Sequence, residues 1–90
     1  MQAVYLEVTF RGGKALAAYL YLPRNEGDKS TRVEKRGPGL LVDLNEDGRP
    51  IGIEIAIPAL VTVEAVNQVL TSYGLAAIDS AELSPLRTAA

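Results

Sequence analysis

The chain's most suggestive chemical spacing is a set of oxygen-bearing side chains between positions 43 and 54. They match the calcium-loop pattern D-x-[DN]-x-[DN]-G-x5-E at every specified position, with Asp43, Asn45, Asp47, Gly48 and Glu54. Calcium prefers about six to eight oxygen ligands, and this spacing supplies them when two flanking helices fold the loop around the ion. The chemistry of the segment therefore depends on what flanks it.

The flanks have the period of β-strands. Apolar residues alternate on both sides of the turn, at Leu40, Val42 and Leu44 and then at Ile51, Ile53, Ile55 and Ile57. A period of two built from aliphatic and β-branched residues predicts two strands. We therefore predict a hairpin whose turn spans residues 45–48, with Gly48 supplying a positive φ.

The register of this hairpin decides whether the residues of the calcium-loop pattern lie close enough to bind one ion. We expect Val42 to pair with Ile51 and Asp43 to oppose Pro50, so that both apolar sets face one core. Glu54 then lies four residues beyond Pro50, about 13 Å from Asp43 at roughly 3.3 Å per residue, which is too far to share an ion. The pattern is thus attributed to turn chemistry, and no metal site is predicted. The residual candidates for a cation are the tip residues Asn45, Glu46 and Asp47.

Other catalytic chemistry has few residues to use. The chain contains no cysteine and no histidine, so thiolates, the commonest general base and the commonest metal ligand are all missing. Glu7, Asp43 and Glu54 lie on predicted strands, opposite the core-facing positions, and we expect them to be solvent exposed. We therefore predict no enzymatic activity, no catalytic residue and no cofactor.

Composition describes one ordinary globular domain spanning residues 1–90, with 48% hydrophobic and 22% charged residues. No apolar run approaches the roughly 18 residues of a membrane span and no signal peptide is evident, so we expect a cytoplasmic protein without a membrane partner. The basic residues of segment 24–36 alternate with acidic ones and the net charge is −2. Both features argue against nucleic-acid binding.

The succession of predicted strands and one helix along the chain indicates an α+β domain. Strands are expected at residues 4–10 and 15–22, followed by a polar connection with a possible short strand at 31–35, and then the central hairpin. An amphipathic helix is expected at 62–73, with Thr62 as N-cap and Gly74 as its stop. The predicted fold is an antiparallel β-meander of four strands, or five if residues 31–35 add one (sheet 3–57). One C-terminal amphipathic helix packs on a face, and a docking segment follows at 74–90.

The second strand is apolar on both faces. Leu16, Ala18, Leu20 and Leu22 alternate with Ala15, Ala17, Tyr19 and Tyr21. A strand of this kind should be covered on both sides, and a short chain has one helix to offer. We therefore expect a homodimer, or contact with another protein, through the face that carries Ala17, Tyr19, Tyr21, Leu41 and Glu54. If that face is buried, Glu54 needs a cation, for which Arg32, Arg36 and Arg49 are available.

Residues 38–55 resemble a small family of uncharacterised prokaryotic proteins of unknown function. The resemblance rests on the signature P-G-(V/L)-x-V-D-x-(D/N)-x-(D/E)-G-x-x-x-G-I-E-I, which this chain matches from Pro38 to Ile55. It implies a compact antiparallel sheet with a helix, no established activity and no accepted catalytic residues. Some relatives appear beside small toxin-like genes, which implies a partner-binding role.

Two functions are therefore expected from different classes. The first is a non-enzymatic protein-interaction module that self-associates. The second is a ligand- or metal-binding domain that uses the acidic hairpin turn.

Overall fold

The computed structural model describes residues 4–87, and residue 3 and residues 88–90 of the predicted sheet and docking segment lie outside this range. Five strands form one antiparallel sheet: β1 (Tyr5–Arg11), β2 (Lys14–Tyr21), β3 (Arg32–Gly37), β4 (Leu40–Leu44) and β5 (Pro50–Ile55). They are followed by a 3-10 turn η1 (Pro58–Leu60), the helix α1 (Val63–Ser72) and a second 3-10 segment η2 (Ser80–Leu86). The α+β class is confirmed, and the optional fifth strand is present as β3.

The strand order corrects the predicted meander. The order is β1-β2-β5-β4-β3, so that β2 pairs with β5 and not with the next strand in the chain. The connection from β2 crosses the ends of β5 and β4, where Arg24 donates to the Ile51 carbonyl at 2.6 Å and the Thr31 N–H to the Leu44 carbonyl at 2.8 Å. This arrangement places isoleucine-rich β5 at the centre and charged β3 at an edge, where charge discourages further strand pairing.

The register of the β4–β5 hairpin also differs from the predicted one. Val42 pairs with Ile53 and Asp43 with Gly52, because the register shifts between Asp43 and Leu44. The turn is longer than expected: the Asn45 N–H donates to the Arg49 carbonyl at 2.9 Å, which closes it over five residues. A slip of two residues keeps Leu40, Val42, Ile53 and Ile55 on their predicted face, where all four are buried, although the pairing was wrong; Ile57, also predicted to face the core, is exposed.

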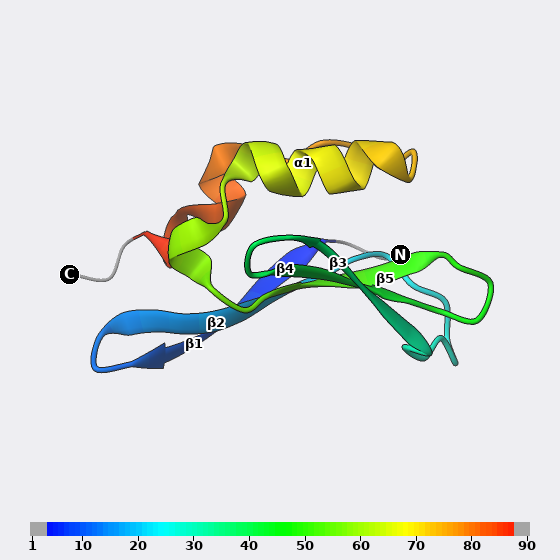
Figure 1. Ribbon diagram of the computed structural model, residues 1–90, viewed down its shortest axis with the longest axis horizontal. Coiled ribbons are helices and arrows are strands. Elements are labelled where there is room, and N and C mark those ends of the chain that lie inside the picture. Colours follow the sequence, from blue (N-terminus) through cyan, green and yellow to red (C-terminus); the bar gives the residue numbers. More distant parts are fainter. Residues whose placement is uncertain (1–3, 88–90) are drawn as a thin grey trace.

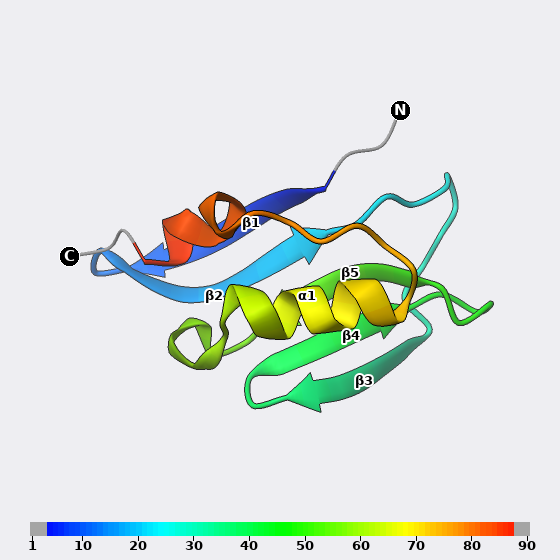
Figure 2. The ribbon, with the colours of Figure 1, turned by 90° about the horizontal axis from the view of Figure 1, so that it is seen from above.

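One face of the sheet carries the core. α1 lies over β4 and β5, and η2 lies over β1 and β2 on the same side (Figures 1 and 2). Val66, Val69 and Leu70 of α1 are buried, as are Leu83 and Leu86 of η2. They pack with Leu22, just past β2, and with the inward-facing residues of the strands, which are Ala18, Leu20, Leu40, Val42, Leu44, Ile53 and Ile55.

The helix begins as the sequence predicted. Thr62 has an extended backbone and its hydroxyl accepts the Ala65 N–H at 3.1 Å, which satisfies one of the free donors of the first turn. Among residues 4–87, no helix is long and apolar enough to cross a membrane.

The predicted inner face of β2 is wrong at one position. The β1–β2 register shifts between Thr9 and Phe10 and skips Leu16, which is 53% exposed. Ala15, predicted to face outward, packs instead against the core. An irregularity of this kind exchanges the faces of the residues beyond it.

Candidate functional site

The outer face of the sheet, opposite α1 and η2, is ordered as rows of side chains. Directly paired residues of antiparallel strands share a face. One row crosses all five strands: Glu7 pairs with Tyr19, Tyr19 with Glu54, Glu54 with Leu41, and Leu41 with Lys35. The row therefore begins with an acidic edge and ends with a basic one, and Glu54 of the central strand is its midpoint.

A second row lies beside the first. It consists of Tyr5, Tyr21, Gly52, Asp43 and Val33, in the order β1-β2-β5-β4-β3. Its two ends are exposed apolar side chains, with Tyr5 56% and Val33 48% accessible. The outer face thus combines aromatic and aliphatic surface with two carboxyls at its centre.

All five residues predicted as an interface lie on this face. Ala17, Tyr19, Tyr21, Leu41 and Glu54 are each half-buried, and pairing makes Glu54 the neighbour of both Tyr19 and Leu41. The structure brings them together from three strands. Their role in binding a partner remains a prediction.

The tyrosines form a connected aromatic strip from the β1 edge to the centre. The Tyr5 and Tyr21 rings stack with centroids 4.5 Å apart, and Tyr19 meets Tyr21 edge-on at 4.7 Å. The Arg24 guanidinium lies 5.6 Å from the Tyr21 centroid, and the Tyr21 hydroxyl donates to Glu7 at 3.1 Å. That hydrogen bond to Glu7 raises the pKa of Tyr21 above its ordinary value. These contacts hold the large rings in one orientation, so less side-chain conformational entropy would be lost if a partner bound to this face.

Asp43 is the most buried charged group on the outer face. It is 7% exposed, and the Tyr19 hydroxyl donates to its Oδ2 at 2.7 Å. Its Oδ1 is buried and has no hydrogen-bond partner among the described residues. A buried carboxylate oxygen without a donor is unfavourable, so this atom marks a place where a further donor is expected.

Gly52 leaves room for the Tyr19 ring, whose hydroxyl donates to Asp43. A Cβ at this position would lie 1.9 Å from the Tyr19 oxygen and 2.2 Å from its Cζ. The ring therefore crosses directly over the backbone of the central strand to reach Asp43. Burial, followed by the bond to Asp43, raises the pKa of Tyr19, so that its hydroxyl stays protonated and acts as a donor.

Glu54 lies beside Asp43, which corrects the distance argued from the sequence. The neighbouring Asp43 carboxyl, chiefly as an acceptor for a hydrogen bond from protonated Glu54, followed by burial and by the charge of Asp43, raises the pKa of Glu54 from 4.5 to about 7. With Asp43 paired to Gly52, Glu54 is two residues further along β5, on the same face. The estimate of 13 Å failed because it used the wrong register.

The arginine side chains that were expected to pair with Glu54 contact other groups in the structure. Arg49 pairs with Asp28 at 2.5 Å. Arg36 donates to Ser72 and lies over the Tyr73 ring, and Arg32 approaches Glu34 at 3.7 Å. The group that accompanies Glu54 is thus another carboxyl. The sequence signal that could have found it is the pair of acidic residues on facing strands of a hairpin.

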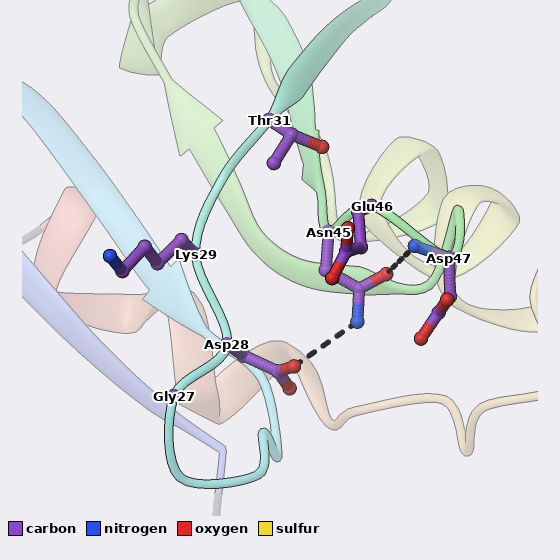
Figure 3. Close-up of a pocket in the computed structure, with 7 residues that line it drawn as sticks. All are labelled: Gly27, Asp28, Lys29, Thr31, Asn45, Glu46 and Asp47. Carbon is purple, nitrogen blue, oxygen red and sulfur yellow. Dashed lines mark hydrogen bonds between the residues drawn. The ribbon is translucent and has the colours of Figure 1, made fainter.

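The acidic turn and the connection from β2 to β3 together line a separate pocket of about 370 Å³ (Figure 3). Its lining residues are Gly27, Asp28, Lys29, Thr31, Asn45, Glu46 and Asp47. Figure 3 shows that they come from two segments, the connection from β2 to β3 and the β4–β5 turn. Of the three tip candidates for a cation, Glu46 and Asp47 are exposed and Asn45 is buried.

Asn45 holds the turn together. Its Oδ1 accepts the N–H groups of Asp47 and Arg49, both at 2.9 Å, and its amide donates to Asp28 at 3.2 Å. Bonds from the Asn25 backbone and from Arg49 lower the pKa of Asp28. Within residues 4–87 no three His, Cys, Asp or Glu side chains are grouped closely enough to hold a metal ion. Asn45 of the calcium-like pattern is thus used in the hydrogen bonds of the turn.

The fold and this surface define a class of protein: a small α+β domain whose antiparallel sheet has helices on one face. Residues 17–56 match the model of a family described as "Protein of unknown function (DUF2283)". The match runs from within β2 to just past β5 and includes most of the outer-face rows, as well as the stretch 38–55 that carries the sequence signature. It supports membership of an uncharacterised domain family. No curated protein and no solved structure matches the chain.

Proposed function

We propose that the protein is a non-enzymatic interaction module that self-associates as a dimer through the outer face of its sheet. The observation that carries this proposal is the row Glu7–Tyr19–Glu54–Leu41–Lys35, which crosses all five strands at one level. The surface is partly apolar, and the helical segments of the chain lie on the opposite side (Figure 1).

The row is complementary to its own copy. Face-to-face packing about a two-fold axis parallel to β5 lays the β1 edge of one protomer over the β3 edge of the other. Glu7 then faces Lys35 of the second copy, and Tyr19 faces Leu41. In the neighbouring row, Tyr5 faces Val33 in the same way. Opposite charges thus meet at both edges and apolar groups meet between them, which favours a second copy of this chain as the partner.

Solution mass across a concentration series tests the proposal. We expect light scattering to give twice the chain mass of 9.6 kDa at concentrations above tens of micromolar. A molar mass that stays at one chain throughout the series would contradict the proposal.

A charge swap tests the two-fold arrangement itself. Lys35→Glu and Glu7→Lys each place like charges opposite one another at two symmetry-related contacts, and we expect each to weaken dimerisation by about tenfold or more. The double variant restores opposite charges and should recover most of the affinity. Lys29→Glu, in the exposed connection away from the sheet face, is the matched control. Failure of the double variant to recover would exclude this orientation of the two copies.

A second proposal concerns the pocket at the acidic turn. Its volume and the carboxylates of Asp28, Glu46 and Asp47 favour a small cationic ligand or a cation held through its water shell, since these carboxylates are not grouped closely enough to coordinate a bare ion together. Calcium added to the protein should produce saturable heat by calorimetry and raise the melting temperature. Asp47→Asn should weaken both effects. The absence of heat and of a thermal shift at millimolar calcium would contradict cation binding.

A further inference from the structure

We propose that the Asp43 and Glu54 carboxyls share a single proton and that this proton permits self-association through the outer face. The inference rests on the proposed dimer and adds its regulation. A protonated Glu54 donates a hydrogen bond to the Asp43 carboxylate. The Glu54 side chain is then neutral and presents no charge to the second copy. Loss of the proton leaves two adjacent carboxylates at the centre of the contact surface.

The geometry that carries this inference is the unsatisfied oxygen of Asp43. Asp43 is more than nine-tenths buried, with one oxygen bound by the Tyr19 hydroxyl and the other buried without a donor. Glu54, two residues beyond the Gly52 partner of Asp43 and on the same face of the sheet, is the neighbouring side chain whose protonated carboxyl can supply that donor. If both carboxyls were ionised, they would repel each other and the buried oxygen would stay unpaired. One proton between them removes both penalties.

A metal ion satisfies this oxygen less well than a proton. The oxygen has almost no accessible surface, so an ion could contact it only if Tyr19 or Glu54 moved away. The site also offers two carboxyls and a phenol, and the described residues provide no third acidic ligand. A proton needs no space and no additional ligand.

The remaining charged groups do not substitute for the proton. The Tyr19 hydroxyl of β2 already donates to Asp43. The Arg24 guanidinium partly offsets the rise in the pKa of Tyr19 and lies over the Tyr21 ring. In the row through Glu54, Glu7 and Lys35 lie at the outer edges of the sheet, two strands away. Asp43 is therefore the charged group that faces Glu54.

The proton affects the dimer because of where Glu54 lies. An axis through the middle of the five-strand row passes beside Glu54, so the two Glu54 side chains of a dimer face each other. Two neutral acids can approach without charge repulsion, whereas two carboxylates repel in a contact from which water is being removed. Dimerisation and proton uptake are consequently linked, with two protons per dimer.

Sedimentation equilibrium between pH 6 and pH 8 tests the inference. We expect the association constant of the unmodified protein to fall by at least tenfold across this interval, and by about a hundredfold if two linked protons titrate near pH 7. Glu54→Gln keeps a donor for Asp43 and has no charge, so it should associate at pH 8 as strongly as the unmodified protein does at pH 6. Glu64→Gln, which makes the same charge change on α1, should retain the original pH profile.

Asp43→Asn separates the shared proton from simple charge repulsion. Without the carboxylate of Asp43, Glu54 should ionise in the ordinary glutamate range, and the pH dependence of association should move to more acidic values. Carboxyl ¹³C NMR should follow the same shift in the titration of Glu54. A dimer whose affinity is equal at pH 6 and pH 8 would overturn the inference while leaving the proposed function intact. A monomer at every pH would overturn both.

Discussion

Replacing Gly52 with alanine is expected to lower the free energy of unfolding by about 2–6 kcal/mol. The new methyl group would lie 1.9 Å from the Tyr19 oxygen, so the ring must leave its position over β5. Crowding of a packed site typically costs about 1–3 kcal/mol. Displacing the ring also removes the donor to Asp43, and a buried polar group left without a partner costs about another 1–3 kcal/mol. Chemical denaturation at fixed protein concentration measures the loss.

A double-mutant cycle assigns this loss to the tyrosine. In a Tyr19→Ala background the space above Gly52 is vacated, and the alanine at position 52 should then cost little, because the three nearest heavy atoms all belong to Tyr19. Gly27→Ala is a useful comparison, since a Cβ there meets nothing within 4 Å and introduces backbone strain alone. Equal losses from Gly52→Ala in both backgrounds would show that the conflict lies in the β5 backbone itself.

Replacing Glu54 with glutamine is expected to stabilise the protein at pH 8 by about 1–2 kcal/mol and to change little at pH 5. The fold raises the pKa of Glu54 from 4.5 to about 7, so the folded state binds a proton that the unfolded chain releases at lower pH. The stabilising contribution is full below pH 4.5 and is lost as the pH rises through 7. Partial solvent exposure of Glu54 reduces the effect from the larger value that the pKa shift alone implies.

Thermal or urea unfolding between pH 4.5 and pH 8.5 measures this dependence. The unmodified protein should lose stability towards pH 8, whereas Glu54→Gln should give a flatter curve. Asp43→Asn should also flatten the curve above pH 5, because it removes the hydrogen bond and the charge that raise the pKa of Glu54. Glu82→Gln, at an exposed position of η2, is the control. Parallel curves for the unmodified protein and Glu54→Gln would contradict the shared proton.

The sequence by itself determined the elements and most of the faces of the sheet, with Leu16 and Ile57 as exposed exceptions. The alternation of β4 and β5 predicted which residues point to the core, and Leu40, Val42, Ile53 and Ile55 are all buried. Thr62 as a helix cap was predicted from a local hydrogen bond between neighbours in the chain. These features depend on a period of two or on contacts a few residues apart, which a sequence records directly.

Only the tertiary structure decided which strands are neighbours and in what register. The meander was wrong because the crossing from β2 to the β3 edge depends on the burial of β5, a property of the whole sheet. The hairpin register was wrong because the Asn45 side chain closes a turn one residue longer than the glycine position suggested, and because the pairing shifts by one more residue between Leu44 and Asp43. That slip of two residues brings Glu54 to Asp43 and places Tyr19 over Gly52. The carboxyl pair was therefore missed in the sequence, since its members meet only through the pairing that the long turn imposes.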